Sequence, residues 1–250
     1  MFPIKYFLLI ILSIYTSSIW MKDEDWDYLV MAVEWPPSFC YTFPKKIQCC
    51  DTSHVTGWNL HGLWPSSSKG SDPLCCKNAS AYDEKKLKPI MEDLLKEWNP
   101  LGNCSKDFWK HEWKFHGTCA SHNKLLHTEL QYFNETIQMK KHVDLTNILH
   151  QNNVKPDNNK MYKVSDFVNV IKKVYKVEPK LQCTHYKGKI YILAMEFCFD
   201  TKLNIIMCPK RHKSEDHLSR HRNKCRKPRN STNPIHIPCT TGFLYQPFSP

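Results

Sequence analysis

KIYILAMEFCFD (residues 189–200) and NIIMC (204–208) are the stretches that decide the fold. Both runs are rich in β-branched and aromatic residues and are joined around a short TKL segment, so they predict a β-hairpin. Cys198 and Cys208 could face each other across this hairpin and form a disulfide. Another apolar run, DYLVMAVEW (27–35), predicts a buried strand that the two following prolines end.

Two further segments predict amphipathic helices. In 83–98 the apolar residues recur at steps of three and four, and Pro89 falls early enough to be tolerated or to mark the true start. In 165–175 a similar stripe follows Ser165, which is the expected N-cap. Helices and strands are interspersed without a regular βαβ alternation, so the predicted fold class is α+β, with an antiparallel sheet core and packed helices.

The 250 residues are 41% hydrophobic, which excludes global disorder and suits one large domain. Residues 1–18 are expected to be a secretory signal peptide, because the apolar run YFLLIILSIY is too short to span a bilayer and TSS offers a cleavage site. An uncleaved anchor is the alternative. The mature domain would be 19–250, in which no stretch approaches 18 apolar residues.

Twelve cysteines behind a signal peptide indicate a disulfide-stapled, secreted protein. Four N-glycosylation sequons fit the same compartment, at Asn78, Asn103, Asn134 and Asn230. The formal net charge is +11, and residues 209–230 carry nine Lys or Arg against two acidic residues, a net +7. Such a segment would attract polyanions such as RNA, anionic glycans or a cell surface, although a solvated loop is the plainer interpretation.

The segment FWKHEWKFHGTC (108–119) concentrates residues that carry chemistry. On an α-helix at about 100° per residue, Glu112, Phe115 and His116 lie at about 100°, 40° and 140° from His111, so all four share one face. Trp113 points to the opposite side, where it can anchor the helix in the core. Gly117 is expected to end the helix.

Three interpretations of this face compete. Two histidines and a carboxylate can bind a metal, but the spacing i, i+5 turns the second imidazole about 140° from the first, unlike H-E-x-x-H. The second interpretation is acid–base chemistry near neutral pH, and the third is a solvated polar face. A second metal set, formed by Cys208, His212, His217, His221 and Cys225, is disfavoured by oxidising export.

A partner acid is available in WNLHGLWP (58–65), where His61 stands among apolar residues and Gly62 permits close backbone approach. A histidine among tryptophans could equally be a core residue. Taken together, HGLWP and FWKHEW..HGTC resemble the two active-site segments of the ribonuclease T2 family. The resemblance runs from LVMAVEWPPSFC through VEPKLQC to PCTTGFLYQP, nearly the whole mature chain.

This resemblance implies a secreted or lysosomal, monomeric endoribonuclease that acts on single-stranded RNA and needs no metal or cofactor. It implies that His116 is the general base on the 2′-hydroxyl and that His61 is the general acid on the leaving 5′-oxygen, which leaves a 2′,3′-cyclic phosphate. His111 would hold the phosphate and Glu112 would polarise it. Trp64 and Phe108 match positions that line the base site. Trp58 is expected to be core.

The chain departs from the family pattern H-E-x-x-K-H, because Phe115 stands at the lysine position. Lys114 is the neighbouring cation and a candidate phosphate ligand, although its Cβ starts about 100° round the helix from position 115. Loss of one preorganised charge would cost roughly 10²–10³ in rate, which predicts a slow enzyme. Glu34 stands where the family often has Gln, and a carboxylate there would oppose phosphate binding.

The family framework also implies disulfides. The expected pairs are Cys40–Cys49, Cys50–Cys104, Cys183–Cys239 and Cys198–Cys208, with Cys119 bonded to Cys75 or Cys76. The remaining cysteine of that adjacent pair would meet Cys225 and tie down the basic segment, a pairing that the family framework does not supply. The alternative function is a secreted glycoprotein effector, cytotoxic or immune-modulating, with weak catalysis on the same fold and with residues 209–230 binding anionic glycans or a receptor.

Overall fold

A computed structural model describes residues 26–42, 52–77, 79–102, 107–210 and 236–248. The expected signal peptide, nearly all of the basic segment 209–230 and three of the four sequons lie outside these residues, as do the three histidines of the disfavoured metal set. Asn134 is the described sequon and is half-buried in a helix. None of the helices in the described ranges is long and apolar enough to cross a bilayer.

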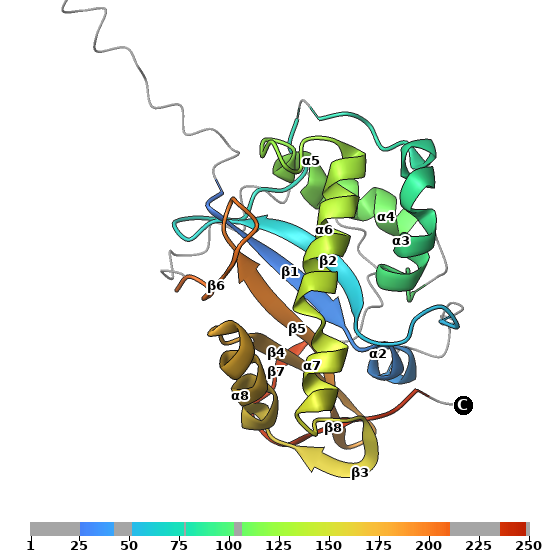
Figure 1. Ribbon diagram of the computed structural model, residues 1–250, viewed down its shortest axis with the longest axis vertical. Helices are drawn as coiled ribbons and strands as arrows, with labels where there is room; N and C mark the ends of the chain where they lie inside the picture. Colours follow the sequence, from blue (N-terminus) through green and yellow to red (C-terminus); the bar gives the residue numbers. More distant parts are fainter. Residues whose placement is uncertain (1–25, 43–51, 78, 103–106, 211–235, 249–250) are drawn as a thin grey trace, which may run out of the picture.

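The sheet has the order β2-β1-β5-β4-β7, and every pair along this path is antiparallel (Figure 1). Its five strands are β1 (Tyr28–Glu34), β2 (Asn59–Ser66), β4 (Lys180–Tyr186), β5 (Lys189–Phe199) and β7 (Ile237–Pro238). Three short strands join its margins, namely β3 (Asp157–Tyr162), β6 (Ile205–Ile206) and β8 (Phe243–Tyr245). β8 is parallel to β5, and β5 and β6 form the predicted hairpin. The α+β class with an antiparallel core is therefore confirmed.

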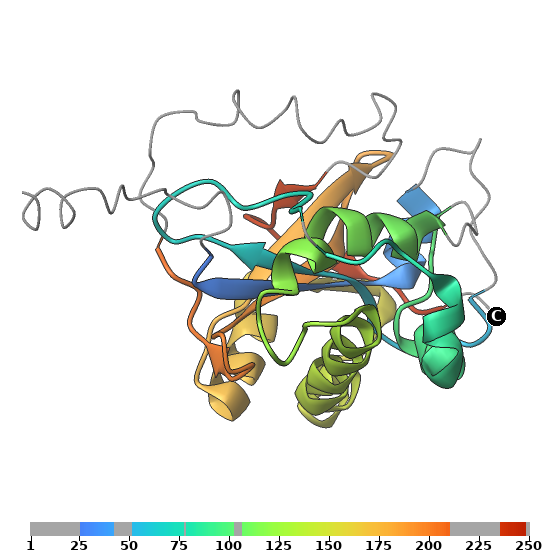
Figure 2. The same cartoon turned by 90° about the horizontal axis from the view of Figure 1, so that it is seen from above.

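Helices lie on both sides of this sheet. Figures 1 and 2 show α6 (Glu129–Val143), α7 (Leu145–Gln151) and α8 (Val164–Tyr175) on one side. In Figure 2 the helical segment 107–120 lies on the other side. That segment consists of α4 (Asp107–Glu112), the π-helix η2 (Trp113–Gly117) and α5 (Thr118–Ala120). The remaining helices are α2 (Pro36–Thr42), the 3₁₀-helix η1 (Glu84–Ile90) and α3 (Met91–Glu97).

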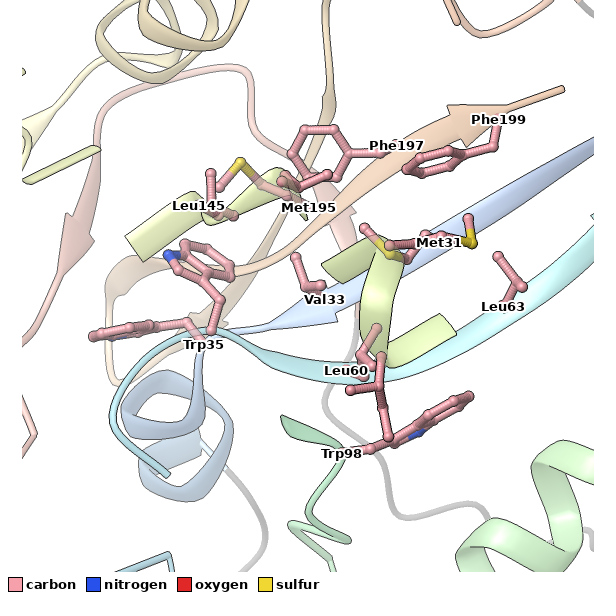
Figure 3. Packing of buried hydrophobic residues seen from close by; sticks show 14 of the residues in the cluster. Met31, Val33, Trp35, Leu60, Leu63, Trp98, Leu145, Met195, Phe197 and Phe199 are labelled. Carbon is pink, nitrogen blue, oxygen red and sulfur yellow. The ribbon is translucent and has the colours of Figure 1, made fainter. Parts of the chain in front are cut away.

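Alternation along β1 separates the two faces of the sheet. Leu29, Met31 and Val33 belong to the main core, together with residues of β2, β5 and the helices (Figure 3). Tyr28 and Val30 point to the opposite face, where they pack against Cys198 and Trp64. Since side chains alternate along a strand, Glu34 lies on this second face as well. We call it the site face, because the candidate site is built on it.

The sequence predicted the strand and both helices, but not all of their ends. Pro36 and Pro37 open α2 as well as ending the strand, because proline suits the first turn of a helix. Residues 83–98 begin as a 3₁₀-helix that contains Pro89, and the α-helix starts only at Met91. The N-cap prediction for Ser165 is wrong. The N-cap is Lys163, two residues earlier, where the Asp166 carboxylate accepts from the backbone N–H of Lys163.

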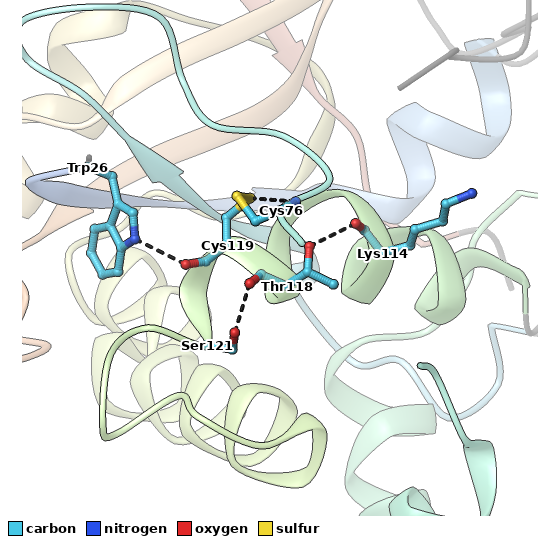
Figure 4. Close-up of a disulfide and its surroundings, with 6 residues drawn as sticks. All are labelled: Trp26, Cys76, Lys114, Thr118, Cys119 and Ser121. Atoms are coloured by element: carbon cyan, nitrogen blue, oxygen red, sulfur yellow. Dashed lines mark hydrogen bonds between the residues drawn. A yellow bond between two sulfur atoms is a disulfide. The ribbon is translucent and has the colours of Figure 1, made fainter. Parts of the chain in front are cut away.

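Three disulfides are described, and they confirm Cys183–Cys239 and Cys198–Cys208. The third, Cys76–Cys119, shows that Cys76 and not Cys75 is the partner of Cys119 (Figure 4). Cys40 and Cys75 are also disulfide-bonded. The expected pairings with Cys49 and Cys225, and that of Cys50 with Cys104, involve residues outside the described ranges.

We predict that the double variant Cys76→Ser/Cys119→Ser unfolds more easily than the variant that lacks Cys198–Cys208. The first bond joins residues 43 positions apart and the second joins residues 10 apart. Loop-closure entropy assigns about 4 kcal/mol to the longer loop and about 1 kcal/mol less to the shorter one. Urea denaturation of both variants measures the difference. A larger loss from the short loop would contradict the entropic account.

Candidate active site

A β-bulge aims His61. In the β1–β2 pairing Ala32 lies opposite Gly62 and Val33 lies opposite Leu60, which leaves His61 as the extra residue of β2. Such bulges re-aim a side chain without ending the strand. The indole Nε1–H of Trp98 donates to the His61 carbonyl at 2.8 Å and fixes the backbone of the bulge. The imidazole is partly exposed, with 20% of its side chain accessible.

Glu34 holds the His61 ring. Its Oε1 lies 2.5 Å from Nδ1 of His61, and the carboxylate is almost fully buried. This contact fixes the ring and engages Nδ1, so proton transfer to a ligand would use Nε2. Glu34 therefore acts on His61, a role that the sequence analysis missed. The available signal was a single carboxylate in an otherwise apolar strand.

The second half of the site lies on a π-helix. The backbone N–H of Thr118 reaches the carbonyl of Trp113, five residues earlier. The prediction that Gly117 ends an α-helix is wrong, since helical structure continues to Ala120. Gly117 serves packing instead, because a Cβ there would lie 2.3 Å from the Trp113 ring. Trp113 is buried, as predicted.

The π-helix changes the geometry expected for the two histidines. Its wider turn brings a residue at i+5 back over residue i. Ring nitrogens of His111 and His116 and a carboxylate oxygen of Glu112 all lie within 4.8 Å of one another. The spacing argument against a shared metal ion is therefore wrong, and this trio could hold a cation. The same closeness suits three groups that act on one phosphate.

Glu112 links the two sequence segments. Its carboxylate is fully buried, and Oε2 accepts from the Trp64 indole N–H at 3.1 Å. Gly62 makes this approach possible, because a Cβ would lie 2.2 Å from the same oxygen. The close backbone approach expected at Gly62 is therefore observed. Burial and the nearby Glu112 charge raise the pKa of Tyr132, whose neutral hydroxyl donates to the Leu63 carbonyl at 2.9 Å.

Aromatic rings complete the site. The Trp64 ring centroid lies 5.2 Å from that of His61 and 5.6 Å from that of His116. Phe108 approaches His61 at 5.8 Å, and both Trp64 and Phe108 are half-buried. Trp64 therefore joins the two histidine groups, and two partly exposed rings border His61. Trp58 is fully buried in the core, as predicted.

Residues 26–208 match the Ribonuclease T2 family. The chain belongs to this family. Ribonuclease T2-A of Mus musculus is 31% identical over 168 residues, which are 66% of this chain and 61% of the mouse protein. Ribonuclease T2 of Danio rerio is 32% identical over 196 residues, 77% and 76% of the two chains. The crystal structure of human RNase T2 has the same fold, with a TM-score of 0.66 at 24% identity over 89% of this chain and 98% of that one.

Phe115 stands at the lysine position of the ribonuclease T2 pattern, but its side chain lies differently from what the sequence suggested. Its ring stacks on that of His111, with centroids 4.1 Å apart and planes 24° apart. Only 8% of the residue is exposed. Phe115 therefore supports the His111 ring from one side, and it does not stand bare on the reactive face between the two histidines.

Lys114 lies closer to the Phe115 ring than the α-helical projection implied. The residue is exposed, and its Nζ lies 6.0 Å from the centroid of the Phe115 ring, the outer limit of a cation–π contact. Its backbone carbonyl accepts from the Thr118 hydroxyl at 3.0 Å (Figure 4).

Proposed function

We propose that this protein is a secreted endoribonuclease that cleaves single-stranded RNA by transphosphorylation. Family membership supports the reaction class. The observation that carries the proposal is the contact of Trp64 with both His61 and His116, together with its hydrogen bond to Glu112. One aromatic residue thereby brings together the groups that an acid–base cleavage of RNA needs.

In the proposed first step, His116 removes the proton of the 2′-hydroxyl, and the 2′-oxygen attacks the adjacent phosphorus. The bond from phosphorus to the 5′-oxygen breaks, and His61 gives its proton to that oxygen through Nε2. The products are a 2′,3′-cyclic phosphate and a free 5′-hydroxyl. Water then opens the cyclic phosphate, with the two histidines in reversed roles.

Glu112 and His111 would stabilise the phosphate while its charge rises. A protonated His111 donates to a phosphoryl oxygen, and its stack on Phe115 fixes the ring for this purpose. The buried Glu112 is held by Trp64 next to both imidazoles, where, when it carries a proton, it can donate that proton in a hydrogen bond to a phosphoryl oxygen. Trp64 and Phe108 offer half-buried rings on which bases can stack.

The experiment for this proposal is cleavage of single-stranded RNA by the purified protein in EDTA, between about pH 4 and pH 8. Cleavage that persists in EDTA is expected. Loss of cleavage on chelation, with recovery on addition of Zn²⁺ or Mg²⁺, would show that the trio at positions 111, 112 and 116 works as a metal site instead.

Glu34 gives a prediction that separates orientation from charge. Glu34→Gln keeps an oxygen that can accept from His61 but removes the charge, so kcat should fall by roughly 10- to 100-fold, the value of a charge-assisted hydrogen bond. KM should fall too, because the carboxylate repels the phosphate. The matched control is Glu97→Gln, which removes the buried carboxylate that binds Lys140 elsewhere in the fold. An unchanged kcat in Glu34→Gln would show that Glu34 does not position the acid.

Secretion belongs to the same proposal. Disulfides form and persist in oxidising compartments, and the three described bonds, with two more bonded cysteines, are typical of an exported protein. Removal of residues 1–18 from the protein expressed in a eukaryotic cell should retain it in the cytosol and leave its thiols reduced. Export of the truncated chain would contradict the signal-peptide prediction.

A further inference from the structure

A group of three tyrosines lies on the site face, away from the histidines. Tyr41 of α2 meets Tyr186 of β4 edge to face, with ring centroids 5.1 Å apart, and meets Tyr191 of β5 at 5.5 Å. Tyr41 is 46% exposed, Tyr186 is half-buried and Tyr191 is buried. Burial and the neighbouring Tyr41, which also shares a hydrogen bond with Tyr191, raise the pKa of Tyr191. The group is thus an anchored cluster with two accessible rings.

A cation is fixed beside these rings. Tyr186 pairs with Lys189, so the β4–β5 turn consists of Lys187 and Gly188 alone, and both have positive φ, 48° and 76°. Two consecutive residues with positive φ are the mark of a tight hairpin turn that matches the strand twist. This turn places Lys187 Nζ 5.2 Å from the centroid of the Tyr186 ring. His185 and Lys189, on either side of the turn, are also exposed and basic.

The cluster shares a sheet face with the candidate active site. Glu34, which holds His61, pairs with Ala194 of β5. Tyr191 stands three residues before Ala194, and a β-bulge between them, where Gln182 pairs with Ala194 and Cys183 with Ile192, keeps both residues on the site face. β5, which carries Tyr191, lies two strand spacings from β2, and Tyr191 is three residues along from Ala194. These steps place Tyr191 roughly 15 Å from His61, and Tyr186 on β4 lies farther away. A few nucleotides of extended single strand can span that distance.

The acidic groups on this part of the site face suit bases better than phosphates. Glu196 lies on the same face of β5, level with His61, and accepts from the Gln182 amide at 3.3 Å. Glu34 lies nearer the tyrosines but is buried and held by His61. The half-buried Glu196 repels a phosphate, but a carboxylate can accept from the amino group of a base. A strand that crosses this face would therefore turn its bases toward the sheet, and would end with one base on the tyrosines.

We propose that Tyr41, Tyr186 and Lys187 bind an unpaired nucleotide of a single-stranded RNA that extends beyond the cleaved dinucleotide. The exposed rings provide stacking surfaces for the base, and Lys187 binds the adjacent phosphate. The combination of aromatic rings with cations is what proteins use to hold single strands without sequence preference. This inference rests on the proposed function for its choice of ligand, but it concerns a separate site.

The test measures binding without cleavage. A fluorescent strand of about 12 nucleotides, 2′-O-methylated at every position, has no free 2′-hydroxyl and cannot be cleaved by the proposed reaction. Its Kd, measured by anisotropy, should rise roughly 5- to 100-fold in Tyr41→Ala and Tyr186→Ala, because each removes one stacking ring. Tyr41→Phe and Tyr186→Phe should bind almost as the parent does. Lys187→Asn tolerates the positive φ and should also weaken binding.

The matched control is Lys160→Asn, which removes an exposed lysine that lies 4.5 Å from another tyrosine ring, on β3. It should leave the Kd unchanged. An unchanged Kd in both alanine variants would overturn the proposal, as would an equal loss in the phenylalanine variants. Cleavage of a dinucleotide is measured in parallel and should be the same in every variant. If the parent protein fails to cleave it, the proposed function fails, while the binding result still decides the tyrosine site.

Discussion

Replacing His61 or His116 with phenylalanine is expected to lower kcat/KM for RNA by roughly 10²–10⁴-fold, because each removes one proton-transfer group. The two losses should not add in the double variant, since acid and base act in the same step. Initial rates with a fluorogenic RNA substrate measure the effect. The fold should survive in His61→Phe, because His61 is partly exposed and a phenylalanine can keep the ring contact with Trp64, but the loss of the partner of the buried Glu34 carboxylate should lower the unfolding temperature.

His150→Phe is the matched control. His150 is an exposed histidine at the border of a cavity of about 490 Å³ that has no residue in common with the candidate site. The His150→Phe variant should cleave RNA at the parental rate and unfold at a temperature similar to that of the parent protein. If His61→Phe and His116→Phe cleave as fast as His150→Phe, the acid–base assignment is wrong.

Phe115→Lys is expected to raise kcat by up to ~10²-fold, because a lysine at this position can bring a positive charge to the phosphate. The change also removes the stack on His111 at 4.1 Å. An aromatic pair of this kind is worth about 0.5–1.5 kcal/mol. A preorganised charge stabiliser is worth about 2.7–4 kcal/mol in the transition state, so the gain outweighs the loss.

Two companion variants make this result interpretable. Phe115→Leu removes the stack without adding charge, so it should slow cleavage slightly and reports the cost of the lost support alone. Lys114→Ala removes the exposed cation near the Phe115 ring. If Lys114→Ala abolishes cleavage and Phe115→Lys adds nothing, Lys114 already serves the phosphate. Flat results in both would show that charge on this helix does not limit the rate.

The sequence was sufficient for β1, β5 and β6, but it did not predict β2, β3, β4, β7 or β8. Apolar runs with β-branched residues predicted β1 and β5, and the family resemblance correctly indicated the pairs Cys183–Cys239 and Cys198–Cys208. These features depend on local composition and on long, specific motifs. Both can be recognised before any tertiary contact is known.

The predictions that failed concerned features that depend on tertiary packing. A uniform 100° per residue could not show that the segment around Trp113 adopts a π-helix, because nothing in its residue types favours one extra residue per turn. Packing of Trp113 in the core and the contact of Gly117 with its ring accompany that geometry. For the same reason the sequence could not show the bulge at His61 or its contact with Glu34. Both arise from the register between two strands.

The central claim is that the RNA supplies its own nucleophile and that the protein supplies only acid–base and phosphate-binding groups. It is tested most directly with a DNA strand that contains a single ribonucleotide, incubated with the protein in EDTA. The account predicts one cut, on the 3′ side of that ribonucleotide, with a 2′,3′-cyclic phosphate on one product and a 5′-hydroxyl on the other. Mass spectrometry of the two products identifies both ends. Cleavage at deoxynucleotides, or a product with a 5′-phosphate, would contradict it.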